Sequence, residues 1–179
     1  MPTQTQRDEF EGSFSYHVGV LMATSRLYLN QGAQLANNTG GPNPQYAAAD
    51  ALFEMILVRV RSFDSFLGCV GNQKTDAHAT DWVPGWQRGS VLIGTERNDI
   101  SKRLPHLTYL QPPVHQWPIG EIVRRCCEGL EAFLFQVGPS APKEWEDRHI
   151  ELEEFLKEHA TQQWNRIWTE NDNHAHRRQ

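Results

Sequence analysis

Residues 119–137, IGEIVRRCCEGLEAFLFQV, carry the clearest structural signal in this chain of 179 residues. Their apolar residues recur at steps of three and four, the spacing that places side chains on one face of an α-helix. These residues are Ile119, Ile122, Val123, Cys126, Cys127, Leu130, Phe133, Leu134 and Val137. Pro118 before the segment and Gly138-Pro139 after it are typical of helix ends. The segment therefore predicts an amphipathic helix that buries this face against other helices.

Helical spacing of apolar residues recurs on both sides of this segment. It predicts helices over about residues 15–37, 44–67, 95–104 and 142–168. No stretch alternates apolar and polar residues as a half-buried strand does. We therefore expect an all-α fold, a bundle of four to five helices.

The remaining segments are predicted to form a loop and the two ends of the chain. Residues 68–91 are rich in glycine and predict a long irregular loop between the second and third helices, with Trp82 and Trp86 packed onto the bundle. Residues 1–13 are polar and are expected to form a disordered lead-in. We expect one helical domain over residues 14–170 and a disordered tail over residues 171–179.

Composition narrows the class of protein. The chain has 17 Lys plus Arg against 22 Asp plus Glu, a net charge of −5, which disfavours non-specific binding to DNA. No run of apolar residues is long enough for a membrane span, so no membrane association is expected. The 3 cysteines include no Cys-x-x-Cys pair, and we expect reduced thiols in a cytoplasmic protein.

Familiar catalytic motifs are absent from the sequence. It contains no Gly-x-Ser-x-Gly elbow, phosphate-binding loop or dinucleotide fingerprint, which disfavours acyl transfer and nucleotide hydrolysis. Cys126 and Cys127 lie on the apolar face and are expected to act as small buried hydrophobes. Glu146 and His149 form a Glu-x-x-His pattern, but a di-metal bundle needs two such pairs. We therefore expect neither a metal nor a cofactor, and a bundle that binds a metal or a small ligand, suggested by this pair and by the 8 histidines, is kept as a third alternative.

The segment 96–109 holds the main candidate for catalysis. If it is helical, Asp99, Arg103 and His106 share a face, where a guanidinium and an imidazole could orient a phosphodiester and move protons. In the alternative interpretation, Asp99 and Arg103 form an ordinary ion pair and His106 packs after Pro105.

Arg61 is a second candidate, at the edge of the apolar face of the second helix. It either points into a polar pocket between helices or extends from the core edge and pairs with Asp64.

Three segments together suggest a relationship. Residues 51–67 (ALFEMILVRVRSFDSFL), 81–86 (DWVPGW) and 100–108 (ISKRLPHLT) resemble a group of small bacterial helical proteins, which are in turn similar to the HEPN superfamily. The resemblance implies a bundle of four or five helices, frequent homodimers and, in many members, metal-independent cleavage of RNA in toxin or phage-defence systems. Other members act as non-catalytic binding domains. The site residues that the resemblance implies are His106, Arg103 and Arg61.

Two functions follow as expectations. The first is a non-catalytic HEPN-like interaction module that binds a protein partner or forms a homodimer. The alternative is a metal-independent ribonuclease, in which His106 is the acid and base while Arg103 or Arg61 holds the phosphate of RNA. Two residues separate Arg103 from His106 and eight separate Arg97 from it, and neither spacing matches the catalytic signature of the superfamily. This favours the module.

Overall fold

The computed structural model describes residues 3–28, 44–69, 76–87, 89–103, 116–159 and 166–167. These residues form five α-helices, which are α1 (Gln4–Leu27), α3 (Pro44–Leu67), α4 (Glu96–Arg103), α5 (Ile119–Val137) and α6 (Lys143–His159). They also form the 3₁₀ turns η2 (Ala79–Asp81) and η3 (Gly138–Ser140) and the short strands β1 (Gln116–Trp117) and β2 (Arg166–Ile167). The predicted all-α fold is confirmed.

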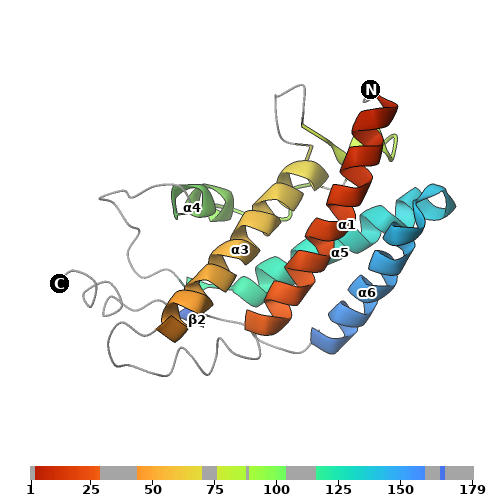
Figure 1. Ribbon diagram of the computed structural model, residues 1–179. Coiled ribbons are helices and arrows are strands. Elements are labelled where there is room, and N and C mark those ends of the chain that lie inside the picture. The colour runs from red at the N-terminus through yellow and green to blue at the C-terminus, as the bar shows by residue number, and fades with distance from the viewer. Residues whose placement is uncertain are drawn as a thin grey trace.

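The four long helices form a bundle in which each helix contacts two others (Figure 1). α1 packs against α3 and α6, and α5 packs against the same two helices. The short helix α4 contacts α3. None of the described helices combines the length and apolar character that a membrane crossing requires.

Aromatic rings join these four helices at the centre of the bundle. Phe14 of α1, Phe66 of α3, Phe133 of α5 and Trp145 of α6 are all buried. The ring centroids of Phe14 and Trp145 lie 4.6 Å apart, and those of Phe66 and Phe133 lie 5.0 Å apart. Each such pair contributes about 0.5–1.5 kcal/mol beyond the area that it buries. One ring from each helix thus fixes the position of all four.

The first helix begins earlier than predicted. α1 starts at Gln4, so the prediction of a disordered lead-in over residues 1–13 is wrong from that residue on. The Thr3 hydroxyl accepts a hydrogen bond from the Gln6 N–H, and the Gln6 side chain accepts one from the Thr3 N–H, a reciprocal cap. The Phe10 ring then stacks on Phe66 at 5.2 Å. The Phe10 side chain anchors a helical turn that is otherwise polar.

The irregular loop between α3 and α4 packs against the bundle through its tryptophans, as predicted. Trp86 is buried, and its indole N–H donates a 2.7 Å hydrogen bond to the carbonyl oxygen of Leu67 at the end of α3. Trp82 is partly buried, and its ring centroid lies 4.4 Å from that of Phe10. The loop therefore bridges the end of α3 and the start of α1.

The bounds of α3 and α5 agree with the apolar spacing that predicted them. α6 does not: it ends at His159, whereas the pattern predicted a helix to residue 168. Residues 166–167 pair instead with residues 116–117 in an antiparallel ladder, with Gln116 opposite Ile167 and Trp117 opposite Arg166. Residues 29–37 of the predicted first helix, and the tail from residue 171, lie outside the described residues.

Candidate functional site

The residues predicted for catalysis are not brought together by the described part of the structure. His106 lies outside the described residues, and Arg103 is the last residue of α4, where only the backbone is described. Arg61 is exposed on α3. Their relation to one another therefore stays a prediction.

Asp64 is held by partners far along the chain, and the predicted pair with Arg61 is not formed. Its carboxylate is fully buried and forms an ion pair with Arg97 of α4. It also accepts hydrogen bonds from the Ser90 hydroxyl and from the backbone N–H of Leu92, the latter at 3.0 Å. Because a buried carboxylate must be paired, these contacts tie the loop and α4 to α3. We assign Asp64 a structural role.

The adjacent cysteines of α5 are buried, as predicted. Burial, together with the nearby negative charge of Glu128, raises the pKa of the Cys127 thiol to about 12. The thiolate is the nucleophilic and metal-binding form of cysteine, so this position is chemically inert near neutral pH. Cys127 fills space in the core.

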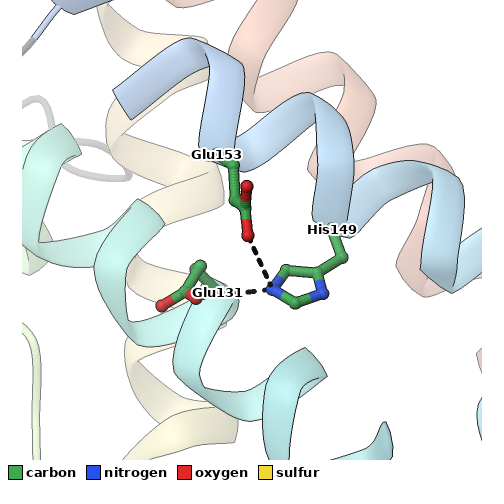
Figure 2. A group of neighbouring side chains, drawn as sticks. All are labelled: Glu131, His149 and Glu153. Atoms are coloured by element: carbon green, nitrogen blue, oxygen red, sulfur yellow. Dashed lines mark hydrogen bonds and ion pairs between the residues drawn. The ribbon is translucent and has the colours of Figure 1, made fainter. Parts of the chain in front are cut away.

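His149 has acidic neighbours in the described part of the chain, and they are Glu131 and Glu153 rather than Glu146. Its Nε2 atom lies 3.4 Å from Oε1 of Glu131 on α5 and 3.9 Å from Oε1 of Glu153, one turn further along α6 (Figure 2). Sequence reasoning missed Glu131 because nothing in the chain indicates which residue of another helix faces His149. Glu153 was within reach of the spacing rule, since residues four apart share a helix face.

The Glu131–His149–Glu153 cluster is open to solvent on one side. The exposed fractions of these side chains are 31%, 24% and 47%. Lys157 binds Oε2 of Glu153 at 3.1 Å, which leaves Oε1 directed toward the imidazole. The exposed ring of Phe135 lies against the imidazole, with ring centroids 6.4 Å apart.

A second feature is an apolar surface on the side of α1 and α3 that no other described helix covers. We call it the outer face. Four of the seven exposed large hydrophobic side chains in the described residues lie on these two helices, at Tyr16, Leu27, Met55 and Val58. The outer face comprises Tyr16, Val20, Ala23 and Leu27 of α1 and Ala48, Ala51, Met55, Val58 and Ser62 of α3. Figure 1 shows the two helices side by side.

Charges border the part of the outer face on α3. Glu54 and Arg61 are both exposed and lie seven residues apart, so they share one edge of this surface. At the other edge, Arg59 approaches His17 of α1. Burial of the imidazole and the positive charge of Arg59 lower the pKa of His17 below its usual value, so His17 is held neutral. Of Arg59 and His17, which approach each other between α1 and α3, only Arg59 therefore carries a charge.

Comparison with known proteins identifies no relative. No protein-family model matches the chain, and no curated protein or solved structure matches it. The class that the fold defines is an all-α helical bundle. Because a fold class does not determine function, the function must be argued from the surfaces and clusters described above.

Proposed function

We propose that the protein is a non-catalytic interaction module that forms a homodimer through the outer face. The observation that carries this proposal is the spacing of exposed residues on α3, where residues 48, 51, 55, 58 and 62 alternate steps of three and four. This is the spacing of the a and d positions of a coiled coil, which bury themselves against a partner helix. Over this stretch the surface is about 21 Å long at 1.5 Å per residue.

The opposite charges of Glu54 and Arg61 at the edge of the outer face favour a second copy of this chain as the partner. In a two-fold antiparallel arrangement centred between Met55 and Val58, each Met55 faces Val58 of the other copy. Glu54 of one copy then lies beside Arg61 of the other, and the symmetry repeats the contact. Exposed ion pairs contribute only about 0.2–1 kcal/mol each. The apolar surface therefore supplies the affinity, and the two charge pairs set the orientation.

The outer residues of α1 would extend the interface beside α3. Tyr16 is 62% exposed near the middle of α1, and Leu27 is 45% exposed at its last residue. Large aromatic side chains are enriched at protein interfaces, whereas large exposed apolar surfaces are rare on monomers. The HEPN resemblance, which implies frequent homodimers, agrees with this proposal.

Sedimentation equilibrium of the wild-type chain tests the proposal. We expect a dimer that dissociates on dilution. Met55→Lys should place two cations in the interface and yield a monomer, whereas Ile150→Lys, at an exposed position on α6, should leave the dimer intact. A wild-type protein that is monomeric at all concentrations tested would overturn the proposal.

Charge variants test the antiparallel orientation. Glu54→Arg places like charges opposite Arg61, and Arg61→Glu places like charges opposite Glu54, so we expect each variant alone to dimerise more weakly. An equimolar mixture of the two should form a heterodimer, because every facing pair is then of opposite charge. In a parallel arrangement Glu54 would face Arg59 instead, and Arg61→Glu would have little effect.

The ribonuclease is the alternative, and it makes a different prediction. RNA incubated with wild-type and His106→Ala protein, with a chelator present, should remain intact in both samples if the module is non-catalytic. If the wild type cleaves RNA and His106→Ala does not, while the dimer is unchanged, the protein is a ribonuclease and the proposal of a non-catalytic module is wrong.

A further inference from the structure

The Glu131–His149–Glu153 cluster joins the outward sides of α5 and α6 and plays no part in the proposed dimer. We propose that it binds a first-row divalent transition-metal ion of the Zn²⁺ type. The ligands are Nε2 of His149 and one carboxylate oxygen from each glutamate. The inference stands independently of the proposed function, because none of these residues belongs to the outer face.

Distances between the donor atoms fit such an ion. The Nε2 atom lies 3.4 Å from the Glu131 oxygen and 3.9 Å from the Glu153 oxygen, and all three donor atoms lie within 4.8 Å of one another. A tetrahedral Zn²⁺ with bonds of about 2.0–2.1 Å separates its ligand atoms by about 3.3 Å. Small side-chain rotations therefore suffice, and Figure 2 shows the imidazole nitrogen directed toward both carboxylates.

The ligand types select the class of metal. Mg²⁺ and Ca²⁺ are bound almost entirely by oxygen, whereas an imidazole nitrogen favours zinc and neighbouring transition metals. His149 and Glu153 lie four residues apart, so both ligands project from one face of α6. Glu131 supplies the third ligand from α5, and an ion bound here would clamp the two helices together.

Two neighbours position the ligands. Lys157 holds Oε2 of Glu153 and so leaves Oε1 for the ion, the kind of outer contact that orients a metal ligand. The ring of Phe135, which is itself 71% exposed, lies beside the imidazole in a T-shaped arrangement with ring centroids 6.4 Å apart. The fourth coordination position faces solvent, where a water molecule or a small anion would complete the tetrahedron.

The competing explanation is a simple hydrogen bond between His149 and Glu131. At 3.4 Å this bond is long, and Glu153 at 3.9 Å is beyond hydrogen-bond distance. A single nitrogen cannot satisfy both carboxylates, whereas a cation binds both. The two explanations differ in whether Zn²⁺ is retained and in what it does to stability.

Titration of the chelator-treated full-length chain with ZnSO₄, followed by calorimetry and by thermal unfolding, tests the site. We expect one bound ion and a melting temperature raised by about 5–10 °C when free Zn²⁺ is a hundredfold above the dissociation constant. Glu131→Gln and His149→Gln should each weaken binding at least about tenfold and abolish the rise in melting temperature. Glu146→Gln is the matched control, because Glu146 is an exposed glutamate of the same helix, and it should behave like the wild type.

Cys69, His174 and His176 have side chains of types that can also bind zinc, so the titration is done in a Cys69→Ser, His174→Ala, His176→Ala background. Circular dichroism of each variant without metal confirms that it is folded. Zinc binding that is equally tight in Glu131→Gln, or no saturable binding in this background, would overturn the proposal.

Discussion

Arg97 of α4 forms an ion pair with Asp64 of α3, although the two lie 33 positions apart and Asp64 is completely buried. The same carboxylate binds the Ser90 hydroxyl and the Leu92 N–H. One side chain thereby holds the end of the irregular loop and the helix that follows it. Ile100, the one apolar residue of α4, is also fully buried, and Glu96 of α4 pairs with Arg125 of α5.

Asp64→Asn should destabilise the protein by about 2–3 kcal/mol, because it removes the charge that Arg97 pairs with and places an amide N–H₂ against existing donors. Arg97 is 29% exposed, so solvent compensates part of the loss. Urea unfolding measures the change. Asp147→Asn, at an exposed position on α6, should change the free energy of unfolding by less than about 0.5 kcal/mol. Equal effects of the two substitutions would contradict the assignment.

Trp86→Phe should cost about 1–2 kcal/mol more than Trp82→Phe. Both substitutions remove an indole, but the Trp86 N–H donates a hydrogen bond to the Leu67 carbonyl, whereas the Trp82 N–H has no partner among the described residues. The two variants thus form a matched pair in which ring size changes equally. Their midpoints of urea unfolding give the comparison, and a larger loss in Trp82→Phe would disprove the role of the bond.

Stability should fall as the pH drops below the ordinary pKa of histidine, in part because of His17. Burial and Arg59 lower the pKa of His17 from 6.5 in the native state, so the unfolded chain binds a proton more readily than the folded one. The contribution of His17 is complete above pH 6.5 and is lost as the pH falls from there through the lower native pKa. Urea midpoints at several pH values between 7.5 and 5 should show a shallower decline in His17→Gln. An identical decline in both proteins would contradict this account.

Only Cys69 should react quickly with a thiol reagent in the native protein. Cys69 is exposed, whereas Cys126 and Cys127 are buried. With its pKa raised from 9.0 to about 12, Cys127 has about a thousandfold less thiolate near neutral pH than an ordinary cysteine. Counting reactive thiols with Ellman's reagent should give one before unfolding and three after it. Cys69→Ser should leave none before unfolding; a reactive thiol that persists there would show that the core opens.

Apolar spacing predicted the helices whose stability comes from burial. α5 and α3 are recognisable from sequence because a continuous face of each is buried, and hydrophobic burial is the dominant driving force of folding. The spacing also identified the buried residues of α5 except Gly129, Cys126 and Cys127 included, whereas the predicted Val137 is only partly buried. It was less successful at the first turns of α1, which Phe10 anchors through a partner in α3.

Predictions that paired residues close in sequence failed where a residue distant in sequence forms the contact instead. Arg61 is three residues from Asp64, yet Arg97 takes the carboxylate, because Asp64 faces the interior and Arg61 faces solvent. Glu146 is three residues from His149, yet Glu131 of another helix lies beside the imidazole. Periodicity reveals which face of a helix is buried, but it does not reveal which helix lies opposite. The long-range partners of both candidate clusters therefore required the structure.

The indole N–H of Trp145 donates a 3.0 Å hydrogen bond to the backbone carbonyl of Glu11, across 134 residues of sequence. The ring that completes the core beside Phe14 therefore comes from the last helix of the bundle. At a synthesis rate of about 5–20 residues per second, roughly 7–27 s pass between translation of the two residues. Throughout that interval the side of α1 that packs against α6 has no permanent cover on the ribosome. This time window gives chaperones that recognise apolar segments their clearest opportunity to bind the nascent chain.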